Sequence, residues 1–225
     1  MSGAFVRATA LASALGPELG AATGRLLGEP CAPQTLMGWP YRAIPVEDRD
    51  WRRRAQAIAG SVAAALRRSA GLPADRWAGL PCLVGSSSFS IGASESEYPV
   101  LELPDAFCRT LAQCFGAGGP VIAMSSACTS GLSALQAALD LIEEGAFSDV
   151  LVLGAEFSNR LTVAGFAGLE LLSPTRARPF DRERDGMVLG EALGAVLVSA
   201  APAEWRGARG APYATRRNPV PVCLA

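Results

Sequence analysis

Apolar residues recur at helical spacing along one long segment that follows Asp48. The apolar positions are Trp51, Ala55, Ile58, Val62 and Leu66. This spacing predicts an amphipathic helix that begins at Asp48, with that aspartate as the N-cap, and that ends just before Gly71. The opposite side of the same segment is rich in arginine, and we expect that side to face solvent.

Short apolar runs alternate with further segments of helical spacing. We expect strands within residues 4–15, 81–85, 120–124, 150–154 and 195–199, and helices within residues 17–28, 105–115 and 132–144. Four prolines in residues 29–47 predict a loop there. Strand, tight turn, helix and strand across residues 120–154 predict a βαβ unit with a right-handed crossover. The helix after residue 131 is almost entirely apolar, which indicates burial on several sides.

The alternation predicts an α/β domain over residues 1–200. The remaining segment, residues 201–225, is rich in proline and arginine and has little periodicity. We expect it to be a poorly ordered, linker-like tail.

Composition excludes several classes of partner. Of 225 residues, 50% are hydrophobic and 18% charged, with a net charge of −1. A globular chain of this charge is not expected to bind nucleic acid or an anionic membrane. No run approaches the ~20 apolar residues of a membrane span. The six cysteines form no C-x-x-C pair, so we expect reduced thiols, a cytoplasmic location and no metal.

The basic residues exclude several familiar catalytic devices. All 20 are arginine, and the chain contains no histidine. A self-contained Ser-His-Asp or Cys-His triad, a histidine metal site and a lysine Schiff base are therefore excluded. Nothing in the sequence calls for a cofactor.

Cys128 is the strongest candidate for chemistry. It lies in a turn of small residues, 125–131, between an apolar strand and an apolar helix. At such a junction the first helical N–H groups and the helix dipole stabilise a thiolate. The pattern is that of a nucleophile elbow. The alternative is a buried cysteine that packs as a small apolar side chain.

Two motifs resemble the β-ketoacyl synthases of the thiolase superfamily. Ser126-Ala-Cys-Thr-Ser-Gly-Leu-Ser-Ala-Leu135 is similar to the active-site cysteine motif of that family. Leu172-Ser-Pro, followed by Arg178-Pro-Phe-Asp-Arg-Glu-Arg-Asp-Gly-Met-Val-Leu-Gly-Glu191, resembles the segment that comes next in it. The likeness covers roughly residues 4–214, where Arg206–Ala214 resembles the linker between the two halves of these enzymes.

The resemblance implies a fold and a mechanism. The fold would be the N-terminal half of a thiolase-like αβαβα architecture, a five-stranded mixed sheet with helices on both faces. Cys128 would accept an acyl group from an acyl carrier protein and would supply one N–H of an oxyanion hole. Decarboxylation of a malonyl unit and condensation would need two histidines from a C-terminal half, and this chain has neither.

The resemblance also implies partners. Strand Val121–Met124 would pair across a dimer axis with its copy or with a full-length ketosynthase. Three functions stay open: the N-terminal half of a synthase in fatty acid or polyketide biosynthesis, a non-catalytic partner similar to a chain-length factor, or the product of a truncated or frame-shifted gene. The cysteine favours the first, and the missing histidines favour the second.

Weaker candidates have structural interpretations beside the functional ones. Phe166 is a candidate lining residue of an acyl tunnel, although core packing is the more common role of such a residue. Asp181, Asp185 and Glu191 are interpreted as loop and turn residues that form ion pairs with arginines of the second motif, namely Arg178, Arg182 or Arg184.

Overall fold

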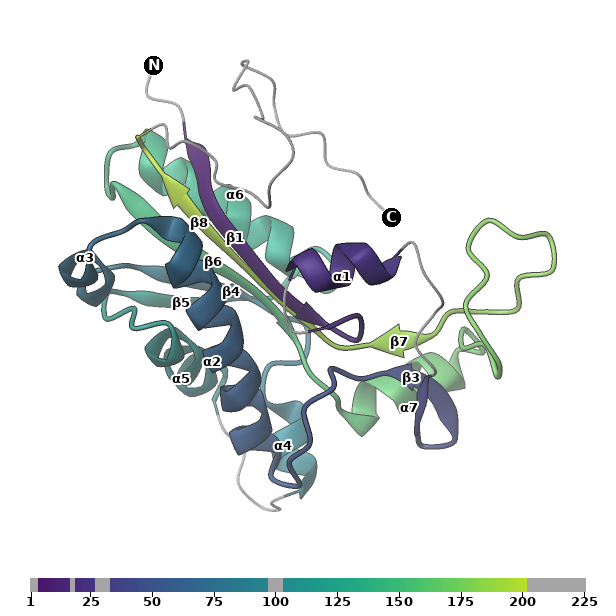
Figure 1. The fold of residues 1–225 in the computed structure, drawn as a ribbon. Helices are drawn as coiled ribbons and strands as arrows, with labels where there is room; N and C mark the ends of the chain where they lie inside the picture. Colours follow the sequence, from purple (N-terminus) through teal and green to yellow (C-terminus); the bar gives the residue numbers. More distant parts are fainter. Residues whose placement is uncertain (1–3, 17–18, 27–32, 97–102, 202–225) are drawn as a thin grey trace.

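A computed structural model describes residues 4–16, 19–26, 33–96 and 103–201. Its framework is a five-stranded sheet in the order β1-β8-β6-β4-β5 (Figure 1). The strands are β1 (Phe5–Ser13), β4 (Cys82–Gly85), β5 (Val121–Met124), β6 (Asp149–Glu156) and β8 (Ala192–Ser199). Strand β4 runs parallel to β5 and β6, whereas β8 is antiparallel to β6 and β1. The sheet is therefore mixed, as expected.

Helices cover both faces of this sheet (Figure 1). One face carries α2 (Trp51–Ala70) and α5 (Pro104–Cys114), and the other carries α6 (Ser130–Glu143). The shorter helices are α1 (Leu19–Leu26), α3 (Ala74–Ala78), α4 (Ile91–Ser96) and α7 (Arg160–Gly168). A separate three-stranded sheet contains β2 (Gln34–Leu36), β3 (Trp39–Arg42) and β7 (Leu189–Gly190). The predicted α/β layering is confirmed.

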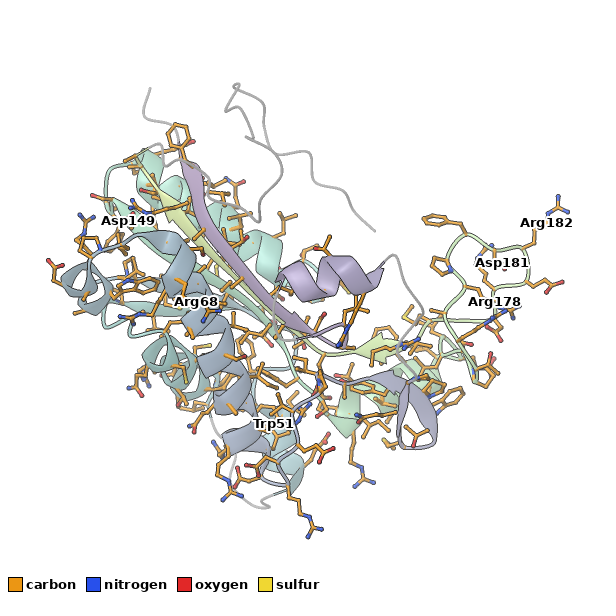
Figure 2. The ribbon with its side chains drawn as sticks, in the orientation of Figure 1. Trp51, Arg68, Asp149, Arg178, Asp181 and Arg182 are labelled. Atoms are coloured by element: carbon orange, nitrogen blue, oxygen red, sulfur yellow. The ribbon has the colours of Figure 1, made fainter. Side chains whose placement is uncertain are left out.

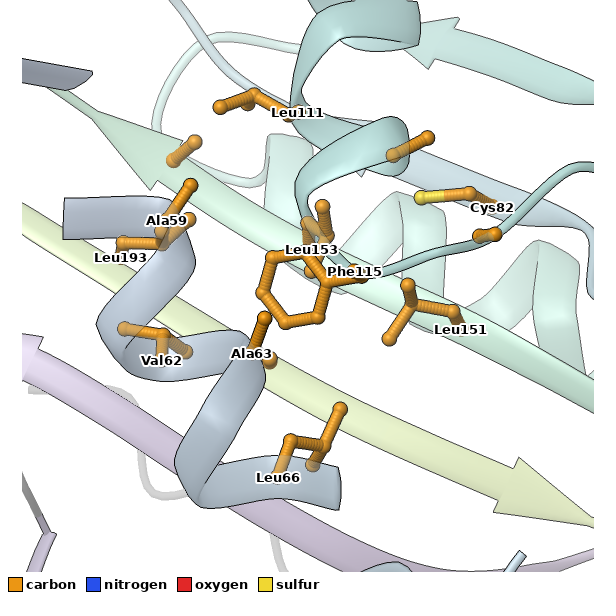
Figure 3. Close-up of a cluster of buried hydrophobic side chains, with 14 of the residues drawn as sticks. Ala59, Val62, Ala63, Leu66, Cys82, Leu111, Phe115, Leu151, Leu153 and Leu193 are labelled. Atoms are coloured by element: carbon orange, nitrogen blue, oxygen red, sulfur yellow. The ribbon is translucent and has the colours of Figure 1, made fainter. Parts of the chain in front are cut away.

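The larger core lies between α2, α5 and the sheet. Small residues of α2, including Ala59 and Ala63, let the helix approach leucines of β6 and β8, and the ring of Phe115 fills the space beside them (Figure 3). Phe115 is fully buried. Close packing of small helical residues against branched strand residues fixes the position of α2 on the sheet.

Helix α2 has the apolar stripe that the sequence predicts, because Ile58, Val62 and Leu66 are fully buried. Gly71 ends it in the left-handed conformation (φ 57°). The predicted N-cap, Asp48, is wrong: Asp50 accepts the hydrogen bond from the Arg53 amide at 2.8 Å. Asp48 lies two residues before this N-cap and forms an ion pair with Arg53 instead.

The loop predicted for residues 29–47 is wrong in its second part. Residues Gln34–Leu36 and Trp39–Arg42 form the β2–β3 hairpin. Met37 (φ 54°) and Gly38 (φ 83°) reverse the chain between them. Two adjacent residues with positive φ are typical of the tight hairpin turn, and this turn allows a short strand despite Pro40.

Helix α6 is buried on one side only, contrary to the prediction. Its buried stripe is Ser130, Ala134, Ala138 and Ile142, at intervals of four residues, and it faces β4 and β6. Leu132 is 41% exposed. The apolar pattern reports the capacity of the helix for burial, and this chain covers only the side that faces the sheet.

The predicted βαβ unit consists of β5, α6 and β6, with β4 lying between the two strands in the sheet. The beginning of α6 is pressed against the end of β4. A Cβ atom at Gly85 would overlap the Ser130 carbonyl group and would lie 2.6 Å from the Gly131 nitrogen. Only glycine fits at residue 85, so this contact fixes where the turn before α6 is placed.

We therefore expect Gly85→Ala to lower the free energy of unfolding by about 1–3 kcal/mol, because backbone must move to admit the methyl group. The matched control is Gly60→Ala on the exposed side of α2, where a Cβ atom meets nothing within 4 Å. That change should raise stability by about 0.5–1 kcal/mol. Urea unfolding measures both, and a Gly85→Ala protein as stable as wild type would contradict the close contact.

Candidate functional site

A cavity of about 350 Å³ opens at the carboxyl ends of β4 and β6, beside the turn that leads into α6. Its walls come from both sheets, from that turn and from α7. The lining residues include Tyr41, Ser87, Cys128, Glu156, Phe157, Asn159, Val163, Phe166, Leu189 and Gly190. Residues from distant parts of the sequence thus meet at one end of the sheet.

Hydrogen bonds within the turn hold Cys128 in place. The Ser130 hydroxyl donates to the Ala127 carbonyl at 2.6 Å and accepts from the Ser126 amide at 3.0 Å. The Thr129 hydroxyl donates to the Ser126 carbonyl at 2.8 Å. Ala127 adopts a positive φ of 54°, an uncommon conformation for alanine that produces the sharp bend.

Cys128 is exposed and lines the cavity. It precedes Thr129, the N-cap residue of α6, and Thr129 makes no capping hydrogen bond with its side chain. The thiol therefore lies at the junction between the turn and the beginning of α6. This exposure disfavours the alternative of a buried packing cysteine, and the nucleophilic role of Cys128 stays a prediction.

The other described cysteines have different surroundings. Cys82 and Cys108 are buried, and Cys114 is partly buried. Burial raises the pKa of Cys82 and also that of Cys114. Cys31 and Cys223 lie outside the described residues, as does the predicted tail after residue 201. Among the described thiols, Cys128 alone is exposed.

Phe166 lines the same cavity as Cys128. It is partly buried and packs against the small cluster of Tyr41, Val163 and Leu172. The structure brings together the two site residues predicted from the sequence, and Phe166 both packs against the core and borders the cavity. Its role as a tunnel residue stays a prediction.

Glu156 is a cavity residue that sequence reasoning missed. The Ser88 hydroxyl donates to its Oε2 at 2.6 Å, the Ser86 hydroxyl donates to its Oε1 at 3.3 Å, and the Ser87 amide also donates to Oε1. The run of serines at residues 86–88 is visible in the sequence, but the carboxylate that accepts its hydrogen bonds lies some 70 residues away. This carboxylate fixes the loop that forms one wall of the cavity.

Glu191 has a different role from the one predicted. It does not pair with the arginines of its own motif but with Arg54 of α2, through two contacts of 2.6 Å. Its oxygens also accept from the Ile44 amide at 2.7 Å and the Ser158 amide at 2.8 Å. Burial raises the pKa of Glu191, but the hydrogen bonds and charge of Arg54 outweigh it and hold that pKa below its ordinary value.

The loop that carries the rest of the motif projects away from the five-stranded sheet, as Arg178, Asp181 and Arg182 show (Figure 2). Arg178 lies 3.6 Å from Asp185, as predicted, and 3.5 Å from Glu183. A hydrogen bond from Ser173 lowers the pKa of Asp185, and Arg178 adds to this effect. Asp181 accepts from the Glu183 amide at 2.9 Å instead of forming a predicted ion pair.

Within the described ranges, no three histidine, cysteine, aspartate or glutamate side chains are grouped so that they could hold a metal ion. Nor does any described helix combine the length and the apolar character that crossing a bilayer requires.

Comparison with known proteins places this architecture in a family. The family model described as the β-ketoacyl synthase N-terminal domain matches residues 54–203. The chain belongs to the β-ketoacyl synthase family. The matched region includes most of α2, the Cys128 turn and the Glu191 motif, so the resemblance of the two sequence motifs is confirmed.

Two relatives show how much of such proteins the chain represents. The tetracenomycin polyketide synthase ketoacyl synthase alpha subunit of Streptomyces glaucescens is 42% identical over 131 residues, which cover 52% of this chain and 30% of that protein. Nodulation protein E of Rhizobium meliloti is 29% identical over 223 residues, covering 87% and 53%. The chain therefore spans about half or less of the length of these relatives.

Solved structures support the same fold. A ketosynthase in complex with its chain length factor from Xenorhabdus doucetiae matches with a TM-score of 0.71 and 22% identity, over 90% of this chain and 59% of that chain. A β-ketoacyl synthase from Burkholderia phymatum gives a TM-score of 0.72, with coverage of 88% and 59%. The fold is that of the N-terminal half of a thiolase-like ketosynthase.

The ion pair between Glu191 and Arg54 is shielded from solvent and should contribute strongly to stability. Glu191→Gln should lower the free energy of unfolding by about 3–5 kcal/mol at neutral pH, because Arg54 then keeps a buried charge without its partner. The side chains of Glu191 and Arg54 are 0% and 13% exposed. The control is Asp105→Asn, which breaks an exposed ion pair with Arg109 and should change stability far less.

The effect of Glu191 should depend on pH in one direction. Because its pKa is lower in the folded chain, its stabilisation is present above the ordinary value of 4.5 and is lost as the pH falls through the folded-state pKa. The gap between wild type and Glu191→Gln should therefore shrink below about pH 4.5. A gap that stays constant in acid would show that the carboxylate does not stabilise the fold as an ion.

Proposed function

We propose that this chain is the acyl-accepting half of a β-ketoacyl synthase and that Cys128 is the acceptor. The observation that carries the proposal is the exposed thiol on a rigid turn, at the uncapped beginning of α6 and at the edge of a cavity. The thiolate attacks the thioester carbonyl of an acyl carrier protein. The new C–S bond forms while the C–S bond to the carrier breaks, and the carrier thiolate takes up the proton that the Cys128 thiol released.

Condensation requires groups that this chain does not contain. The family resemblance assigns decarboxylation of the malonyl unit to two histidines, and the sequence has none. General acid–base assistance contributes about 10²–10⁴ in rate for each group. We infer that carbon–carbon bond formation takes place only when a partner polypeptide supplies these side chains.

A second candidate function is that of a non-catalytic partner similar to a chain-length factor. The absence of histidine favours it, and two of the similar solved structures pair a ketosynthase with a chain length factor. The exposed cysteine favours the acyl-accepting role.

Acyl transfer without condensation is the expected behaviour. Incubated with acyl-acyl carrier protein, the chain should gain one acyl group on Cys128, while Cys128→Ala should gain none and malonyl carrier protein should yield no 3-oxoacyl product. Intact-mass and peptide mass spectrometry measure both. A stable, folded wild-type protein that is never acylated would favour the partner role. Robust condensation would show that the reaction does not need the two histidines.

We also propose that β5 pairs with a second copy of the chain or with a full-length ketosynthase. Strand β5 is an edge strand bonded only to β4 in the described sheet, and Ile122 on it is 45% exposed. A bare apolar edge promotes pairing with another strand. Helix α6, which contacts β5, also carries an exposed apolar residue, Leu132.

Ile122→Lys should therefore reduce the mass measured by light scattering to that of a monomer. Val6→Lys is the matched control, because Val6 lies on β1 at the opposite edge of the same sheet and is 37% exposed. It should leave the association intact. A wild-type protein that is a stable monomer, or one dissociated only by Val6→Lys, would contradict pairing through β5.

A further inference from the structure

Helix α7 forms one wall of the Cys128 cavity, to which it contributes Val163 and Phe166. The packing of this helix against the core is slight. It has nine residues, all within the described ranges, and of these Val163 alone is buried. Gly165 and Gly168 lie within it, although a Cβ atom at either would meet nothing within 4 Å. A helix this short, with two glycines, is unstable by itself, so its position depends on how its ends are bound.

The beginning of α7 is bound by a carboxylate from another helix. Glu95 of α4 accepts hydrogen bonds from two successive backbone amides, that of Arg160 through Oε2 and that of Leu161 through Oε1, each at 2.7 Å. Asn159, the N-cap residue, accepts from the third amide, that of Thr162, at 2.7 Å. Two of the first three amides of α7 are therefore satisfied by a residue some 65 positions earlier in the chain. The helix dipole also attracts a carboxylate to this end of the helix.

Helix α4 is a firm support for Glu95. Gly92 on the same helix lies so close to the Ser158 carbonyl group and the Trp51 ring that a Cβ atom would overlap both. The Trp51 indole N–H donates to that carbonyl oxygen at 2.7 Å. Helix α4 is thus packed against α2 and against the residue that precedes the N-cap of α7. Because close packing resists a shift of α4, the Glu95 carboxylate fixes the beginning of α7 relative to the core.

We propose that Glu95 is a positioning residue of the Cys128 cavity, whose carboxylate holds α7 so that the wall formed by Val163 and Phe166 can bind an acyl chain. This inference rests on the proposed acyl-accepting function. Phe166 lies about two turns after Arg160, so a displacement of the beginning of the helix moves the ring with it. Glu95 acts through α7 and not on the thiol. A cavity whose wall is in place for only part of the time binds its ligand more weakly by that fraction.

The test measures alkylation of Cys128 by N-octylbromoacetamide over a range of concentrations, which separates binding of the reagent from the chemical step. The thiolate forms a C–S bond to the reagent and bromide leaves. Glu95→Ala should raise the concentration that gives the half-maximal rate about tenfold, which corresponds to a wall in place for about a tenth of the time. The maximal rate and the rate with iodoacetamide should stay unchanged. Glu95→Gln keeps a single acceptor oxygen and should give an intermediate increase.

Arg7→Ala is the matched control. Arg7 also binds two successive backbone groups of a distant helix, because it donates to the carbonyl groups of Ala70 and Gly71 at the end of α2. It lies on β1 at the opposite end of the sheet from the cavity. Its loss should lower stability, as Glu95→Ala does, but leave binding of the octyl reagent unchanged.

Binding as in wild type in both Glu95 variants would overturn the proposal, and so would an equal loss of binding in Arg7→Ala. The two functional claims can fail separately. A wild-type protein that acyl carrier protein never acylates would refute the acyl-accepting function, while weaker binding of the octyl reagent in Glu95→Ala would still support the role of Glu95. Acylation of wild type together with unchanged octyl binding in the Glu95 variants would refute the positioning role alone.

Discussion

The site depends on the close approach of α6 to the ends of two strands. At the end of β4, a Cβ atom on residue 85 would have no room against Ser130 and Gly131. On its other side, Gly131 faces Gly154 of β6, and a Cβ atom on residue 131 would lie 3.8 Å from the Gly154 Cα atom. A larger residue at position 85 would push the beginning of the helix away from the sheet. The turn before α6 would move with it, and Cys128 would lose its place at the cavity.

Two carboxylates hold the walls around that turn. Glu156 accepts hydrogen bonds from the serine loop after β4, and Glu191 joins α2, the segment at Ile44 and the Ser158 amide. Neither bonds the cysteine in the described contacts. Their hydrogen bonds hold the walls of the cavity together, so that Cys128, Phe166 and Tyr41 keep their relative positions.

Local patterns were sufficient to predict much of this arrangement. The stripe on α2 follows from apolar spacing, and the Cys128 turn follows from a run of small residues between a strand and a helix. The Arg54–Glu191 pair could not be found this way, because its members are 137 residues apart and each resembles an ordinary surface charge. The cap at Asp50 was missed because Asp48 and Asp50 have equal propensity, and only the geometry of the chain decides between them.

Tertiary context also explains why α6 differs from its prediction. Its sequence is apolar enough for burial on several sides, but within this chain only the side toward β4 and β6 is covered. The exposed residues, with the bare edge of β5, form the surface where we propose that another polypeptide binds. The chain spans about half or less of the length of the two curated relatives compared with it.

We infer that the packing of α6 on the sheet presents one reactive thiol, that of Cys128. Brief alkylation of the folded protein at neutral pH, followed by peptide mapping of all six cysteines, tests it most directly. Cys128 should react first, and Cys82 and Cys108 last, with all six reacting alike in denaturant. Reaction of Cys82 or Cys108 as fast as that of Cys128 in the folded chain would contradict this packing. Reaction of Cys31 or Cys223 while Cys128 stays inert would contradict it equally.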